Sequence, residues 1–132
     1  MKRFLAKHSP LFILAGLCLA MALYSSDFRQ PDNLQSVVGR TAVIGIIATG
    51  QLLVILTAGI DLSVGSVAAF AGVAGCLAMT EWNLPIPLGM LIGMGAGLAC
   101  GLTNGILATK GRIPPFIVTL GMMMVARGGA LL

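Results

Sequence analysis

Two uncharged apolar runs, residues 41–60 and 62–80, follow one another with only Asp61 between them. Each run is long enough to cross a bilayer as a helix, because the hydrocarbon core takes about 20 apolar residues. Two straight helices cannot be joined by one residue, so the chain is expected to break or reverse within residues 57–63. Gly59 is expected to supply the backbone freedom for that break. Asp61 or Ser63 is expected to cap the helix that follows.

The composition excludes a soluble protein. Only 9% of the 132 residues are charged and 58% are apolar, whereas typical globular chains carry about 25% charged residues. The chain is therefore predicted to be an all-α integral membrane protein, a polytopic bundle of four spans with a truncated fifth. The expected spans are residues 10–26, 41–58, 62–80, 86–108 and 114–132, within one transmembrane domain over residues 1–132. Residues 24–40 are expected to form a polar loop.

Basic residues near the ends of the apolar runs predict the orientation. Those that matter are Lys2, Arg3 and Lys7 before the first run, and Lys110 and Arg112 after the fourth. By the positive-inside rule, the N-terminus and the 109–112 connection are expected to be cytoplasmic. A cleaved signal peptide is the alternative for the first run. A partly re-entrant segment is the alternative for the Asp61 connection, which carries no basic residue.

Polar residues within the apolar runs are the candidates for function. A carboxylate at the centre of a spanning helix costs about 2.5–3.5 kcal/mol on insertion scales, so Asp61 is expected either to reach water as a helix cap or to face a polar cavity. Gln51 needs hydrogen-bond partners, either for packing or for contact with substrate. Asn104 could bond across helices or cap a turn. The candidates for a substrate pathway or its gating are Gln51, Asp61, Ser63 and Asn104.

A glycine recurs at every fourth residue of the fourth run. The row consists of Gly89, Gly93, Gly97, Gly101 and Gly105. Such a small-xxx-small row lets another helix approach closely in lipid. The row is therefore expected to serve helix packing, either within one subunit or at a dimer contact.

Several chemistries find no support in the sequence. No Walker-type loop is present, so the chain is not expected to bind ATP, and no catalytic constellation suggests an enzyme. Cys18, Cys76 and Cys100 lie in different runs without metal-ligand spacing, so neither a metal nor a cofactor is expected. The net charge of +4 comes from scattered residues, and a nucleic-acid partner is not expected.

Three blocks of the chain resemble one family. LVILTAGIDLSVGS at residues 53–66, KGRIPPFIVTLG at 110–121 and ARG at 126–128 are similar to the ribose/xylose/galactose-type permeases. These are the membrane subunits of bacterial ATP-binding-cassette (ABC) sugar importers. The resemblance covers essentially the whole chain, and the first block is long enough to be specific.

The resemblance implies a permease subunit that forms part of a path for pentoses or hexoses across the bacterial inner membrane. Its implied partners are a second permease subunit in a homodimer, a cytoplasmic ATP-binding subunit and a periplasmic sugar-binding protein. Family permeases have more spans, so the chain is expected to be an N-terminal fragment that inserts but does not transport. The alternatives are a small four-span proton-coupled exporter and a non-transporting membrane interaction protein.

Overall fold

The computed structural model describes residues 8–132, and every regular element in this range is a helix. The elements are α2 (Ser9–Tyr24), the 3-10 helix η1 (Asp27–Arg29), α3 (Pro31–Leu56), α4 (Val64–Thr80), α5 (Ile86–Thr109) and α6 (Pro115–Gly129). The all-α prediction is confirmed for this range. Lys2, Arg3 and Lys7, which carry part of the orientation prediction, lie outside the described residues.

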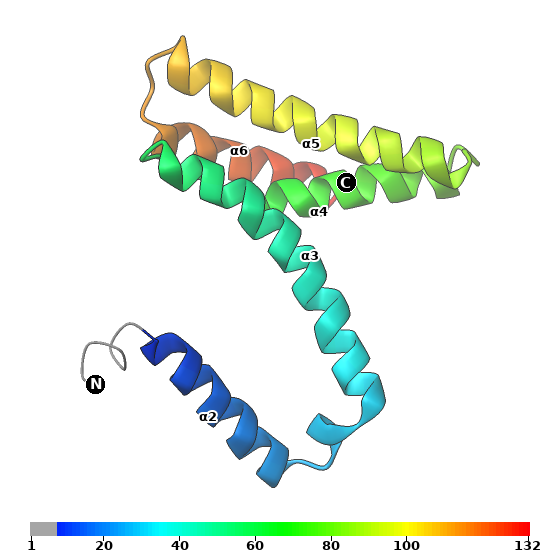
Figure 1. Cartoon of the computed structure of the whole chain (residues 1–132). Coiled ribbons are helices and arrows are strands. Elements are labelled where there is room, and N and C mark those ends of the chain that lie inside the picture. The colour runs from blue at the N-terminus through cyan, green and yellow to red at the C-terminus, as the bar shows by residue number, and fades with distance from the viewer. Residues whose placement is uncertain (1–7) are drawn as a thin grey trace. The chain divides into compact units, whose positions relative to one another are not determined.

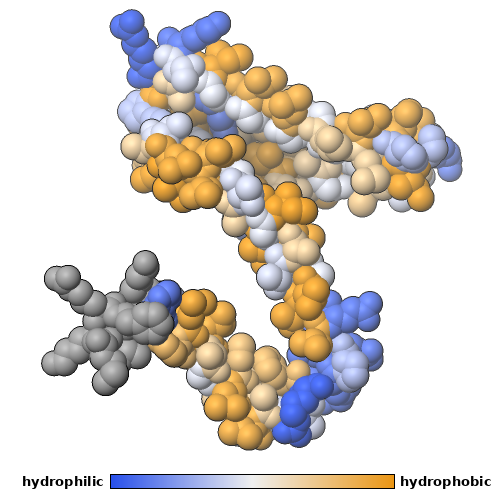
Figure 2. All heavy atoms as spheres, viewed as in Figure 1, coloured by the Kyte–Doolittle hydropathy of each residue, from blue (hydrophilic) through white to orange (hydrophobic). Residues whose placement is uncertain are grey.

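The chain divides into two compact units, one ending at Ile46 and one running from Ile47 to Leu132. In the first unit, α2 is followed by a polar connection that is held by local hydrogen bonds. The Arg29 side chain donates to the Ala22 carbonyl at 2.7 Å, and the Asn33 amide donates to the Phe28 carbonyl at 3.0 Å. Within this unit none of the α2 side chains is buried, and apolar side chains cover much of the helix (Figure 2).

Helix α3 begins at Pro31, within the stretch that the sequence predicted to be a polar loop. Proline suits the first turn of a helix because its fixed φ is helical and its missing N–H would have no intrahelical partner. Asp32 adds a negative charge to the same turn, where its interaction with the helix dipole stabilises the helix. These local signals extend the helix through polar residues that hydropathy alone assigns to a loop.

The second unit is built around α4, which packs against both α5 and α6 (Figure 1). Its closest contacts are between backbones. A Cβ atom added to Gly75 would lie 2.9 Å from the Gly89 carbonyl oxygen, and one added to Gly93 would lie 2.7 Å from that of Ala71. Small residues thus let α4 and α5 approach more closely than side chains would allow.

Helices α3 and α5 are long and apolar enough to cross a membrane, while α2, α4 and α6 are apolar but shorter. Large apolar side chains of α5 stay exposed, including Leu91, Met94 and Leu98. Exposed apolar surface of this extent is expected of helices that face lipid. The five membrane spans and their bounds stay a prediction, and α3 begins at Pro31 rather than at the predicted residue 41.

Candidate functional site at the break between α3 and α4

The chain breaks between Leu56, the last residue of α3, and Val64, the first residue of α4. A Schellman motif closes α3: the Gly59 amide donates to the Val54 carbonyl at 3.1 Å, and the Ala58 amide to the Ile55 carbonyl at 2.9 Å. Ala58 takes the left-handed conformation, with φ of 57°. The expectation that Gly59 supplies this freedom is wrong, because the motif places its left-handed residue at position 58.

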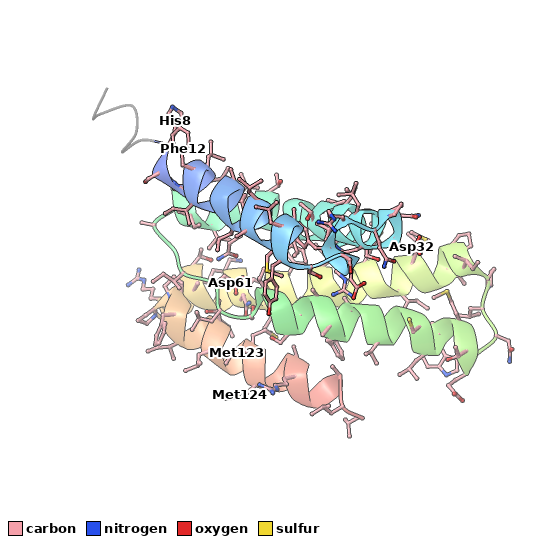
Figure 3. The ribbon with its side chains drawn as sticks, turned by 90° about the horizontal axis from the view of Figure 1, so that it is seen from below. His8, Phe12, Asp32, Asp61, Met123 and Met124 are labelled. Carbon is pink, nitrogen blue, oxygen red and sulfur yellow. The ribbon has the colours of Figure 1, made fainter. Side chains whose placement is uncertain are left out.

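Asp61 binds the start of α4 through its carboxylate (Figure 3). Its Oδ1 atom accepts hydrogen bonds from the Ser63 amide and from the Ser63 hydroxyl, both at 2.7 Å. The negative charge thus lies at the N-terminal end of α4, where the helix dipole stabilises it. Ser63 precedes α4 as its N-cap residue, but its side chain makes no bond to the amides of the helix. The hydroxyl donates to Asp61 instead.

All four candidate residues from the sequence meet at this break. The Asn104 amide donates from α5 to the Ser63 hydroxyl at 3.0 Å, and the Gln51 amide donates from α3 to the Asp61 carbonyl at 3.2 Å. Ser63 is 1% exposed and Asn104 is 8% exposed. The result is one hydrogen-bonded chain that connects α3, the break and α5.

Thr119 joins the same break to α6, although it was not among the residues predicted from the sequence. The Leu62 amide donates to Thr119 Oγ1 at 3.2 Å, and the Ile60 carbonyl oxygen lies 3.2 Å from the same atom. Thr119 is 5% exposed. A threonine in an apolar helix ordinarily bonds to its own backbone, so its residue type gave no signal of a tertiary contact.

Two acceptor oxygens of the polar cluster are left without a donor in the described part of the chain. Both amide nitrogens and the Ser63 hydroxyl donate within it, yet Gln51 Oε1 and Asn104 Oδ1 are buried without a hydrogen-bond partner among the described residues. Leaving a buried acceptor unpaired costs about 1–3 kcal/mol. The cluster is therefore suited to a change of conformation, or to a ligand, that brings further donors to these two oxygens.

A hollow of about 520 Å³ lies beside the break, between α4 and α6. Its lining is mostly apolar, with one hydroxyl and one guanidinium group. The lining residues are Leu62, Gly65, Ser66, Ala69, Val73, Met123, Arg127, Ala130 and Leu131.

The glycine row of α5 divides into two parts. Gly89 and Gly93 lie against α4, whereas a Cβ added to Gly101 or Gly105 would find, among the described residues, no atom within 4 Å apart from the nearby backbone of α5 itself. Four residues exceed one helical turn by about 40°, so a row of this spacing winds around the axis. Gly101 and Gly105 consequently line an open groove of about 560 Å³ on α5, rather than continuing the contact with α4.

Comparison with known proteins gives one family. Residues 33–132 match the family described as "Branched-chain amino acid transport system / permease component". The fructose import permease protein FrcC of Rhizobium meliloti is 36% identical over 88% of the chain. The ribose import permease protein RbsC of Escherichia coli K12 is 38% identical over 96% of the chain.

The galactofuranose transporter permease protein YtfT of Escherichia coli K12 is 45% identical over 79% of the chain. The matched region covers 32% of FrcC, 39% of RbsC and 30% of YtfT. The chain thus spans about a third of the length of these relatives. No solved structure matches it.

Proposed function

Because the chain belongs to the family of branched-chain amino acid transport system permease components, we propose that it forms part of the permease of an ATP-powered sugar importer. The relatives of the chain support a sugar as the substrate, since FrcC, RbsC and YtfT are permease proteins for fructose, ribose and galactofuranose. These matches favour sugar import over the small exporter and the non-transporting membrane protein. The substrate class we propose is a pentose or hexose.

The partners we propose follow from the role of a permease. An ATP-powered importer needs a cytoplasmic ATP-binding subunit, which we propose as the first partner. A periplasmic sugar-binding protein would deliver the substrate, and a second copy of the permease would complete the path. We propose an inner-membrane location with four spans and a fifth, and a cytoplasmic N-terminus. Lys110 and Arg112, which follow α5, support this orientation because positive charges collect on the cytoplasmic side.

The polar cluster at the α3–α4 break is the observation that carries the proposed role of this region. Asn104, Ser63, Asp61 and Gln51 form one hydrogen-bonded chain, in segments that we propose lie in the membrane, where polar side chains are costly and usually functional. Irregular backbone at this depth is tolerated where it is buried in protein or lines a water-filled cavity. We propose that the cluster lines or gates the sugar path, with the hollow between α4 and α6 beside it.

Reconstitution tests the function. The native permease is placed in proteoliposomes with its ATP-binding subunit and binding protein, and uptake of radiolabelled D-ribose, D-fructose and L-arabinose is measured with and without ATP. ATP-dependent uptake of at least one sugar is expected. The control omits the binding protein, which should abolish uptake. Absence of uptake for every sugar, from a complex that still hydrolyses ATP, would contradict the proposal.

A further inference from the structure

The Thr119 hydroxyl contacts the backbone on both sides of Asp61. Its oxygen accepts a hydrogen bond from the Leu62 amide, with 3.2 Å between nitrogen and oxygen, and lies 3.2 Å from the Ile60 carbonyl oxygen. These partners are 57 and 59 residues away in the sequence. One side chain of α6 therefore holds the two peptide groups that flank the carboxylate.

A hydroxyl has one proton to donate and two lone pairs that accept. Accepting from Leu62 leaves the proton of Thr119 for Ile60, or for the Phe116 carbonyl of its own helix at 3.3 Å. The contact with Leu62 is therefore available whichever carbonyl takes the proton. Because Thr119 is only 5% exposed, water has little access to replace the bond.

The position of Asp61 determines the rest of the cluster. Its carboxylate receives both donors of Ser63, and the Ser63 hydroxyl in turn receives the Asn104 amide. A shift of the backbone at residues 60–62 would move the carboxylate away from Ser63. The link from the break to α5 would then weaken as well.

We infer that Thr119 is a positioning residue, which holds the backbone around Asp61 so that the carboxylate keeps its contact with Ser63. The proposal rests on the proposed transport function, since it assigns to Thr119 an effect on transport that acts through Asp61. Thr119 does not need to contact the sugar. The competing explanation is that Thr119 serves only its own helix, through Phe116.

Hydrogen exchange of the purified native permease tests the contact itself. In Thr119→Val, which keeps the shape but loses the hydroxyl, the Leu62 amide should exchange about three- to tenfold faster, as expected for the loss of one hydrogen bond. Thr119→Ser should restore slow exchange. The matched control is Thr103→Val on α5, because among the described residues the Thr103 hydroxyl bonds to Ala99 of its own helix, at 2.8 Å. Unchanged exchange in Thr119→Val would overturn the inference.

Uptake tests the action through Asp61. Thr119→Val should reduce ATP-dependent sugar uptake per permease molecule severalfold, and Thr119→Ser should recover it. Adding Thr119→Val to Asp61→Asn should cause no further loss, because residues that act through one another are not additive. Additive losses would overturn the inference. If Thr119→Val does not accumulate, Thr119→Cys, with its weaker hydrogen bonding, takes its place.

The two measurements separate the inference from the function on which it rests. A wild-type complex that imports no sugar contradicts the proposed function, while the exchange of Leu62 still decides whether Thr119 holds the break. A wild-type complex that imports sugar, together with a Thr119→Val variant that transports normally, overturns the inference alone.

Discussion

Asn104 donates a hydrogen bond from its side-chain amide to the hydroxyl of Ser63, at 3.0 Å and across 41 residues of sequence. Both side chains are buried, and the bond connects α5 to the break that precedes α4. Ser63 passes the connection on by donating to Asp61 Oδ1 at 2.7 Å. Its hydroxyl thus acts as acceptor for one partner and donor for the other, a double role that few side chains can fill.

Replacing Ser63 tests that double role. Ser63→Ala leaves the Asn104 amide buried without its acceptor and removes one donor from Asp61, so we expect the free energy of unfolding to fall by about 1–3 kcal/mol. The measurement is unfolding in mixed detergent micelles. Ser66→Ala is the control, because in the described part of the chain that hydroxyl donates to the Ser63 carbonyl, which also accepts the Val67 amide at 2.8 Å. Equal losses for the two variants would contradict the double role.

Two substitutions of Asp61 separate its charge from its hydrogen bonds. Asp61→Asn keeps an oxygen that can accept both bonds from Ser63, so membrane abundance should be preserved while uptake per molecule falls. Asp61→Ala removes the acceptor and should lower abundance as well. Quantitative immunoblots and uptake assays on the native permease measure both effects. Normal uptake per molecule in Asp61→Asn would assign the residue to capping alone.

Ala58 stores backbone strain that glycine would relieve. The left-handed conformation, with φ of 57°, costs an L-residue roughly 1–2 kcal/mol. Ala58→Gly should therefore stabilise the protein by up to about 1 kcal/mol after the added chain entropy is subtracted. Gly59→Ala is the comparison: its Cβ would lie 3.2 Å from Val54 Cγ1, and no gain is expected. A lower thermal midpoint for Ala58→Gly would argue against the strain.

The two parts of the glycine row should respond differently to alanine. In Gly93→Ala the new Cβ would lie 2.7 Å from the Ala71 carbonyl oxygen, and because backbone cannot move aside cheaply, a loss of about 1–3 kcal/mol is expected. The Cβ of Gly105→Ala would meet no described atom within 4 Å apart from the nearby backbone of its own helix, so the change should cost nothing within this chain. Unfolding in detergent measures both. A large loss in Gly105→Ala, seen only in the assembled importer, would reveal a partner in the open groove.

Cysteine labelling tests the proposed orientation. With Cys18, Cys76 and Cys100 replaced by alanine, a thiol at Glu81 should react with a membrane-impermeant maleimide from the periplasmic side. A thiol at Lys110 should react only after the cells are opened. Glu81 follows α4 and Lys110 follows α5, so the pair reports on both ends of α5. Labelling of both positions from the same side would contradict the proposed span.

Local features of the chain could be read directly from the sequence. Apolar runs predicted five helical segments, and the single Asp61 between two of them predicted the break that ends α3 at Leu56. Hydropathy and chain length carry this information because each helix satisfies its own backbone and needs no distant partner. The polar residues within those runs could also be identified, because a polar side chain is costly in a segment that lies in the membrane.

The tertiary structure decided which of these residues meet. The packing of α5 and α6 on α4 brings Asn104 to Ser63, and it brings Thr119 to the backbone on both sides of Asp61. No local sequence pattern encodes contacts between residues so far apart. The glycines of α5 look alike in sequence, yet the winding of the row places Gly93 against a neighbouring backbone and leaves Gly105 in the open. Residue type and spacing thus determined the elements and the candidates, whereas close packing between helices determined their partners.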